Sequence, residues 1–198
     1  MLKKTTFQRA HGNIKVKINN NEINRFYQSG SAKVFYPKSS QKFKELVLVN
    51  TAGGITSGDN FSYDFEIVNK SKIFLTTQTA ERAYKGFNEK AKIKISLTVD
   101  DTSNLFWIPQ ELILFNNCNF DRKIEVNLSP NSNFVLAETT IFGRTAMGEY
   151  LEKGYFNDNW RINVNKNLIH AEALNLNGDI RETLSNIASA KDLSLIHI

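Results

Sequence analysis

The strongest constraint on this chain is a two-residue alternation of apolar and polar side chains that recurs along most of its length. Apolar residues occupy every second position in the runs 14–18, 61–67, 92–99 and 122–128, and the pattern continues in 160–164 and 168–174. Successive side chains of a strand point to opposite faces, so these runs predict strands with one buried face. The runs 45–49, 72–77, 112–115 and 134–142 are apolar at nearly every position, which predicts strands covered on both faces.

Clusters of Gly, Asn, Asp, Ser and Pro separate these runs at intervals of roughly 8–12 residues, as is typical of all-β proteins. Only 179–193 has helical spacing, through Ile180, Leu184, Ile187 and Ala188. The sequence therefore predicts a mainly β fold of layered antiparallel or mixed sheets, either a β-sandwich or a helical stack of strands. A short helix should lie near the C-terminus. With no linker or repeat, residues 1–198 should form a single domain.

The end of the chain and its composition suggest further expectations. The closing run LSLIHI (193–198) has no evident strand to pair with, which predicts that a C-terminal part is missing. The 25 basic and 20 acidic residues alternate along the chain, so no patch for nucleic acid is expected. No apolar stretch approaches the roughly 18 residues of a membrane helix, and no secretion signal precedes the first strand. A single cysteine, Cys118, fits a reducing compartment and an inert thiol, and we expect a soluble cytoplasmic protein.

The loop NTAGGITSGD (50–59) invites comparison with phosphate-binding loops because it follows an apolar run. A Walker A loop requires a Lys where this loop has Asp59, and a dinucleotide loop requires a following helix where this chain has the alternating run FSYDFEI. We therefore interpret Gly53, Gly54 and Gly58 as residues of a strand connection that needs positive φ or close backbone approach. Asp59 would then be a turn residue.

Carboxylates in apolar surroundings are the more informative candidates. Glu138 lies within the run FVLAETTIF, and burying a carboxylate is costly unless it is paired or binds a cation. One interpretation is a buried ion pair with Arg144 or Arg82. Another is a polar passage for a divalent cation, lined by Asp59, Glu138 and Glu149. The runner-up function is a β-sandwich hydrolase that uses Asp59 and Glu138 as acid and base in an open cleft. A third is a plain β binding module whose buried charges are structural.

Five segments, taken in order, resemble the urease accessory protein UreD family, called UreH in some bacteria. They are LVNTAGGITSGD (48–59), TTQTAERAYKG (76–86), WIPQELILF (107–115), LAETTIFGRTAMGE (136–149) and the weaker LIHAEALNLNG (168–178). Each segment alone is weak evidence, but the ordered set is specific and spans most of the chain.

The resemblance implies a layered β fold and a protein that is not an enzyme. Members bridge apo-urease to UreF and, through UreF, to the GTPase UreG, and they help to deliver nickel through an internal tunnel. No tightly bound cofactor is implied, only Ni²⁺ in passage, for which Asp59, Glu138 and Glu149 are the candidate residues. Family members run longer, so the chain would lack C-terminal strands that contribute to the UreF contact. The matching motif positions expected to be structural are Gly53, Gly54, Gly58, Arg82, Gln110, Gly143, Arg144 and Gly148.

Overall fold

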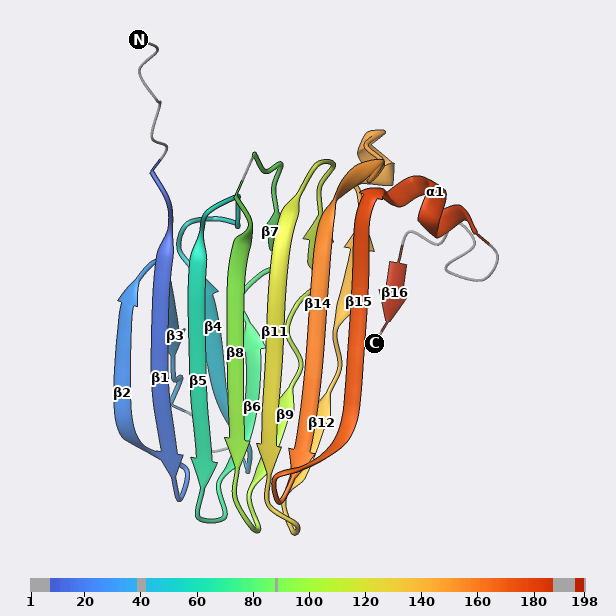
Figure 1. Ribbon diagram of the computed structural model, residues 1–198. Coiled ribbons are helices and arrows are strands. Elements are labelled where there is room, and N and C mark those ends of the chain that lie inside the picture. The colour runs from blue at the N-terminus through green and yellow to red at the C-terminus, as the bar shows by residue number, and fades with distance from the viewer. Residues whose placement is uncertain (1–7, 39–41, 88, 187–194, 198) are drawn as a thin grey trace.

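The chain winds into a solenoid of stacked strands in the computed structural model, which describes residues 8–38, 42–87, 89–186 and 195–197 (Figure 1). Its largest sheet has seven strands in the order β15 (Asn167–Asp179), β14 (Lys153–Val164), β11 (Asn119–Leu128), β8 (Ala91–Val99), β5 (Asn60–Val68), β1 (His11–Asn19) and β2 (Glu22–Gly30). A five-stranded sheet has the order β12 (Asn133–Leu136), β9 (Asn104–Trp107), β6 (Lys72–Thr77), β4 (Lys44–Asn50) and β3 (Ala32–Phe35). A four-stranded sheet has the order β16 (Leu195–His197), β13 (Thr139–Phe142), β10 (Leu112–Leu114) and β7 (Glu81–Ala83).

Three successive turns of the chain each contribute one strand to each sheet: β5–β6–β7, then β8–β9–β10, then β11–β12–β13. Equivalent strands of neighbouring turns pair in parallel, for example β5 with β8 and β8 with β11. The hairpins β1–β2 and β14–β15 close the large sheet with antiparallel edges. Of the two predicted architectures, the helical stack of strands is therefore the correct one.

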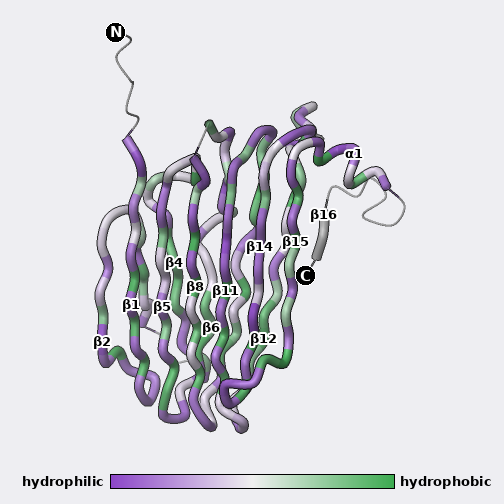
Figure 2. Tube along the Cα trace, in the orientation of Figure 1, coloured by the Kyte–Doolittle hydropathy of each residue, from purple (hydrophilic) through white to green (hydrophobic). Residues whose placement is uncertain are grey.

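In-register stacking places equivalent side chains of neighbouring turns directly beside one another. One inward-facing row across the large sheet joins Ile14, Tyr63, Ile95, Ile124 and Trp160, and all five are buried. Hydropathy accordingly alternates along the central strands of the large sheet (Figure 2). Burial of such rows supplies the main stabilisation, at about 25 cal/mol per Å² of apolar surface.

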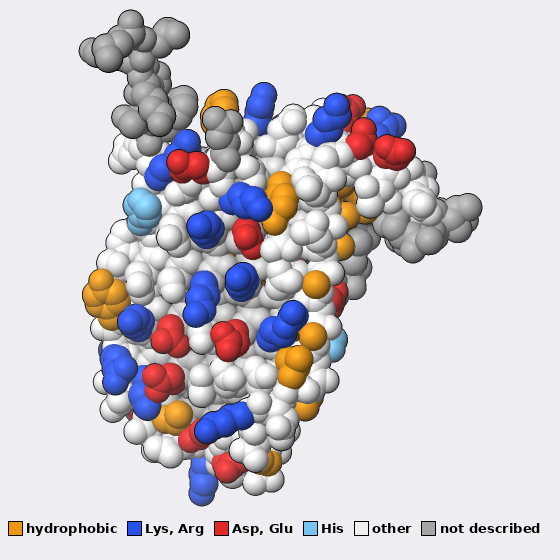
Figure 3. Space-filling model, in the orientation of Figure 1, with side chains coloured by type: hydrophobic (Ala, Val, Ile, Leu, Met, Phe, Trp, Pro, Cys, Tyr) orange, Lys and Arg blue, Asp and Glu red, His pale blue; other side chains and the backbone are white. Residues whose placement is uncertain are grey.

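The outward face of the large sheet carries charges of both signs, interspersed over its surface (Figure 3). Register places Lys15 opposite Asp64 and Lys17 opposite Glu66, and Lys17 Nζ lies 2.7 Å from Glu66 Oε2. Opposite charges directly across neighbouring strands attract each other, but such exposed pairs contribute only about 0.2–1 kcal/mol each.

The predicted double-sided burial of the apolar runs was wrong. In β4 and β10, and in β6 apart from the adjacent buried residues Leu75 and Thr76, buried positions alternate with half-buried ones, so the outward face is only partly covered. The outward apolar side chains shield one another instead: Phe74 lies opposite Phe106 in the next strand, and Phe106 packs edge-on against Phe43 with ring centroids 5.0 Å apart.

The run 134–142 is also not one strand. It divides into β12 and β13, and Ala137 and Glu138 form the corner between the five-stranded and four-stranded sheets. The backbone N–H of Ala137 donates to Trp107 O at 3.1 Å, which ties this corner to the preceding turn of the solenoid. Glu138 is therefore buried at a corner rather than within a strand.

The C-terminal prediction was right about the start of the helix and wrong about its length. Asp179 caps α1 (Ile180–Ser185) by accepting a hydrogen bond from the N–H of Glu182 at 3.0 Å. The helix ends at Ser185 because Asn186 is extended, and residues 187–194 lie outside the described part. The expectation that LSLIHI has nothing to pair with was wrong for Leu195–His197, which pairs antiparallel with β13.

Candidate functional site

A cluster of charged side chains occupies the interior of the solenoid. Alternation turns Arg122 of β11 inward between Phe120 and Ile124, and it turns Asp158 of β14 inward beside it. Arg122 Nε and Nη2 donate to the two carboxylate oxygens of Asp158 at 2.9 and 2.5 Å, and Trp160 Nε1 donates to Asp158 Oδ2 at 3.0 Å. Arg122 and Asp158 therefore form a bidentate pair inside the protein.

Glu138 completes the cluster from the opposite side. Arg122 Nη1 donates to Glu138 Oε1 at 2.5 Å, and the Glu138 side chain is only 3% exposed. Its second oxygen, Oε2, is buried without a hydrogen-bond partner, and so is Nε1 of Trp107. Buried polar atoms nearly always have partners, so these two atoms are exceptions to the usual rule.

The cluster carries one positive charge against two potential negative charges. Burial raises the pKa of Glu138, Arg122 opposes this, and Asp158 reinforces it, so the net direction is upward. Burial alone would lower the pKa of Arg122, but Asp158 and Glu138 together raise it, so the guanidinium stays charged. The interior therefore has a surplus of negative charge, which a proton or a cation must offset.

Glu138 and Trp107 both line one cavity of about 40 Å³, which is large enough for a water molecule and reaches the surface beside the exposed Gln110. We call this space the inner cavity. Its wall is mixed, with apolar side chains from all three sheets and a few polar groups. The polar side chains on it are those of Tyr63, Thr77, Glu81, Trp107, Gln110, Arg122 and Glu138.

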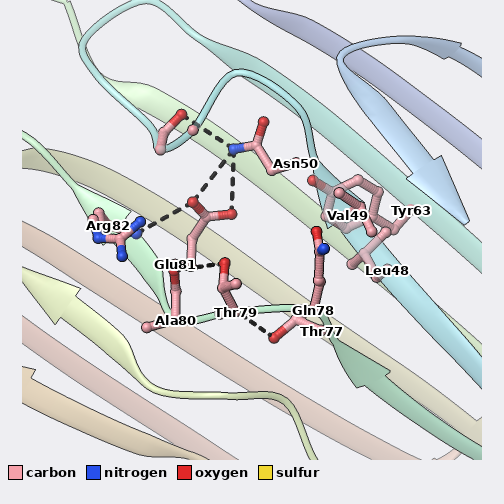
Figure 4. Close-up of a pocket in the computed structure, with 12 residues that line it drawn as sticks. Leu48, Val49, Asn50, Tyr63, Thr77, Gln78, Thr79, Ala80, Glu81 and Arg82 are labelled. Atoms are coloured by element: carbon pink, nitrogen blue, oxygen red, sulfur yellow. Dashed lines mark hydrogen bonds between the residues drawn. The ribbon is translucent and has the colours of Figure 1, made fainter.

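A second space of similar size, the outer pocket, lies next to the inner cavity and shares Leu48, Tyr63, Thr77 and Glu81 with it. The loop after β4 forms one side of the outer pocket, through Asn50, Gly53 and Gly54, and residues 77–82 form another. In Figure 4 the side chains of Asn50 and Glu81 point toward each other across this pocket. Because Gly53 and Thr79 are exposed, the outer pocket lies at the surface.

Glu81 is a further titratable residue that the sequence pattern did not single out. Asn50 Nδ2 lies 3.3 Å from both of its carboxylate oxygens, and the backbone N–H of Arg82 donates to Oε1 at 3.2 Å. Burial raises the pKa of Glu81 to about 7, against the opposing effects of Asn50, the Arg82 backbone, Arg82 and Arg122. The carboxyl group is thus balanced between its neutral and charged forms near neutral pH.

Asp59, the first predicted cation ligand, closes a turn. Its Oδ1 accepts from the N–H of Ala10 and its Oδ2 from the N–H of Thr56, both at 2.8 Å. It lines a separate groove formed with the segment before β1 and does not line the inner cavity. The turn-residue interpretation therefore accounts for both of its oxygens, and the open cleft shared with Glu138 that a hydrolase would need is not formed.

Glu149, another of the predicted cation ligands, lies near the surface, at the rim of the solenoid, in an ion pair with Arg144. Arg144 Nε donates to Glu149 Oε2 at 2.7 Å, Nη2 donates to the same oxygen, and the N–H of Asn116 donates to Oε1 at 3.1 Å. Burial would raise the pKa of Glu149, but the hydrogen bonds from Arg144 and Asn116 lower it overall. Arg144 also lies over the Phe115 ring, 4.3 Å from its centroid.

The predicted structural roles of the motif glycines are supported by geometry. Gly53, Gly54 and Gly58 have φ of 78°, 150° and 82°, and Gly143 and Gly148 have φ of 80° and 72°. A Cβ on Gly54 would lie 2.3 Å from the Tyr84 ring, so this position requires glycine for space as well. Cys118 is buried, which raises its pKa to about 12 and keeps its thiol unreactive.

The remaining motif positions border the two spaces. Arg82 lines the outer pocket next to Glu81, and Gln110 lines the inner cavity. The partner proposed for Glu138 from sequence, Arg144 or Arg82, was wrong, because Arg122 fills that role. The signal was present: Arg122 and Asp158 occupy inward positions of alternating runs, where a charged residue needs a buried partner.

Neither a cluster of metal-ligating side chains nor a membrane-spanning helix is found within the described ranges. No group of three or more His, Cys, Asp and Glu residues could hold a metal ion there. None of the described helices is both long and apolar enough to cross a bilayer.

Comparison with known proteins gives a consistent result. A model of the family described as UreD urease accessory protein matches residues 8–195. A urease accessory protein UreD from Rhodopseudomonas palustris (strain BisB5) is 41% identical over 167 residues, which is 84% of this chain and 59% of that protein. The UreD of Mesorhizobium japonicum is 38% identical over 168 residues, 85% of this chain and 60% of its own length. The UreD of Chelativorans sp. (strain BNC1) is 36% identical over 187 residues, 91% and 68% of the two chains. The matched region thus spans about three fifths of the length of the first two relatives.

Proposed function

Because the chain belongs to the UreD family of urease accessory proteins, we propose that it serves urease maturation as a scaffold whose interior passes Ni²⁺ toward urease. In this proposal it catalyses no reaction. It binds apo-urease and UreF, and through UreF it is linked to the GTPase UreG, with no role for nucleic acid or membrane. Nickel is the cargo of the protein rather than its cofactor.

The observation that carries the proposal is the uncompensated charge of the inner cavity. Arg122 balances only one of the two carboxylates that contact it, and Glu138, which lines the cavity, has its Oε2 buried without a hydrogen-bond partner. A carboxylate oxygen in this position favours a divalent cation that arrives with part of its hydration shell. The same surplus charge keeps anions such as nucleotides out.

Substitution of Glu138 by Gln tests this role. Gln keeps the shape and can still accept a hydrogen bond from Arg122, and the cluster is left with only the neutral Arg122–Asp158 pair. In a maturation mixture of apo-urease, UreF, UreG and Ni²⁺, we expect Glu138→Gln to lower the nickel content of urease while complex assembly persists. Nickel is measured by atomic absorption and assembly by size-exclusion chromatography.

Two further variants complete the test. Glu125→Gln changes an exposed carboxylate on the outward face of β11, the strand that carries Arg122. Urease matured with this variant should contain the normal amount of nickel. Asp59→Asn should also lower the nickel content if the groove that Asp59 lines belongs to the route. Normal nickel loading of urease with Glu138→Gln would mean that the cluster serves only as a structural ion pair. Failure of a version extended to the full length of the family relatives to capture UreF or apo-urease would refute the scaffold role.

A further inference from the structure

One strand at the edge of the large sheet, β15, contains a segment, LIHAEAL (168–174), whose two halves complement each other about the central residue Ala171. His170 and Glu172 lie one position to either side of Ala171, and the two positions beyond each of them are apolar. A strand that pairs antiparallel with a copy of itself places residues at equal distances from the centre opposite each other. Such a pair would place His170 opposite Glu172 twice and apolar residues opposite apolar ones, with no like charges facing.

The outer edge of this segment has no partner strand among the described residues, because β15 ends the large sheet beside β14. The helix α1 follows the other end of β15, after Asp179, so it lies away from the segment (Figure 1). Leu168 and Ile169 are 55% and 62% exposed, and 168–174 contains no Lys, Arg or Pro to discourage pairing. An exposed apolar edge of this kind is a template for another strand.

The backbone of β15 directs free hydrogen-bonding groups outward at Ala171. The N–H of Ile180 donates to the O of Glu152, directly opposite it, at 2.8 Å. From Asp179 to His170 the register with β14 stays regular. Bonded and non-bonded pairs alternate along an antiparallel ladder, so the even-numbered residues of this stretch bond to β14 and the odd-numbered ones point their N–H and C=O groups outward. Ala171 can therefore exchange two hydrogen bonds with Ala171 of a second copy.

The side chains next to Ala171 suit the same arrangement. In such a pair, His170 and Glu172 of opposite copies occupy non-hydrogen-bonded positions, where side chains approach most closely. Within one chain, His170 Nε2 lies 3.8 Å from Glu172 Oε2, too far for a hydrogen bond, and both side chains are partly exposed. Each can therefore turn to the second copy without losing a strong contact. A second copy supplies the complementary segment by symmetry, whereas a strand of another protein would have to match it by sequence.

We propose that two copies of this protein associate through β15, antiparallel about a two-fold axis at Ala171, and so join their seven-stranded sheets into one. The contact is limited to one strand edge, so it buries less than the roughly 1,200 Å² of a standard stable interface. The dimer is therefore weak and forms reversibly with concentration. It involves neither nickel nor the inner cavity, so its test is independent of the proposed function.

Analytical ultracentrifugation of the 198-residue protein tests the association, and we expect a mass that rises with concentration toward twice the 22.6 kDa of one chain. A cysteine at the axis locates the contact, because the Cα atoms of a hydrogen-bonded antiparallel pair lie about 5.5 Å apart, within reach of a disulfide. Mild oxidation should give a covalent dimer of Ala171→Cys. The matched control Asn177→Cys, exposed on the same strand outside the segment, should stay monomeric. The native thiol of Cys118 is buried and should not interfere.

The variant Ala171→Pro tests the backbone pairing. Proline removes an N–H that points away from β14, so the fold loses no ladder hydrogen bond, and thermal melting should show a folded protein. Because both intermolecular N–H donors at the axis disappear, we expect the association constant to fall roughly tenfold or more. The control Asn177→Pro removes an outward N–H outside the segment and should leave association unchanged.

A constant mass of one chain at all concentrations would overturn the proposed dimer. Equal crosslinking of Ala171→Cys and Asn177→Cys, or dimerisation that Ala171→Pro leaves intact, would do the same, because the contact would then lie elsewhere. A mass that rises beyond two chains would also contradict it, since a two-fold contact closes after one partner.

Discussion

Two Arg–Glu pairs in this protein use the same residue types in opposite environments. Arg122 and Glu138 meet inside the solenoid, with side chains 6% and 3% exposed, whereas Arg144 and Glu149 meet at the rim, with side chains 43% and 25% exposed. At the rim water and salt screen the charges, so the pair has a small effect on stability. Inside, each charge depends on its partner, because an unpaired charge there has no access to water.

The pairs also differ in balance. Glu149 has one guanidinium and one backbone N–H to itself, so its oxygens are satisfied. Glu138 shares Arg122 with Asp158 and keeps one oxygen without a partner. A satisfied surface pair holds a loop in shape, whereas an incompletely satisfied interior cluster can receive a ligand. The comparison shows that the same two residue types can be fully or only partly satisfied, depending on the groups that surround them.

Removal of Arg122 should have the largest effect. Arg122→Ala leaves Glu138 and Asp158 buried without a counter-charge, and we expect a loss of about 3–5 kcal/mol in the free energy of unfolding, measured by urea denaturation. The triple substitution Arg122→Met, Glu138→Gln, Asp158→Asn should recover most of this loss, because no unpaired charge remains. A loss below about 1 kcal/mol for Arg122→Ala would mean that water reaches the cluster and compensates its charges.

Glu81 should give an intermediate, pH-dependent effect. Its pKa is raised to about 7 in the folded protein, above its value in the unfolded chain, so the folded state binds the proton more tightly. Wild-type stability should therefore fall relative to Glu81→Gln as pH rises from about 4.5 to about 7, and stay lower above that. The free energy of unfolding of the wild type, relative to that of Glu81→Gln, should be about 1–3 kcal/mol lower at pH 8 than at pH 5. Equal pH dependence of the two proteins would contradict a raised pKa.

The rim pair should give the smallest effect. Arg144→Ala removes a half-exposed ion pair and the contact with the Phe115 ring, and we expect it to cost about 0.5–1.5 kcal/mol. High salt should reduce this difference by screening the ion pair, whereas the effect of Arg122→Ala should change little with salt. A salt-insensitive loss at Arg144 as large as that at Arg122 would abolish the distinction between rim and interior.

Much of the fold followed from local pattern. Alternation in runs such as 61–67 and 92–99 predicted their strands because a strand with one buried face needs apolar residues at every second position. The apolar surroundings of Glu138 in the sequence correctly indicated a buried carboxylate, although it lies at a corner and not within a strand. Choice of architecture did not follow, because alternation is identical in a sandwich and in a solenoid, and only the parallel register between turns distinguishes them.

The residues that form the candidate site were harder to predict than the strands. Asp59 and Glu149 looked equivalent to Glu138 in sequence, but backbone N–H groups satisfy the first and Arg144 the second. Arg122 and Asp158 are 36 positions apart and meet only because β11 and β14 pair in register. Glu81 lies in a short polar segment with no apolar context, so nothing local indicated that loop 50–54 would partly bury it.

The sequence by itself determined that the chain forms strands, which residues face inward and which family the ordered motifs resemble, because these depend on residues near one another in the chain. Tertiary structure alone decided that those strands coil, that Arg122 balances two carboxylates and that Glu81 lies between two spaces. Burial and charge compensation are properties of neighbours in space, and the coiling of the chain brings together residues that are far apart along it.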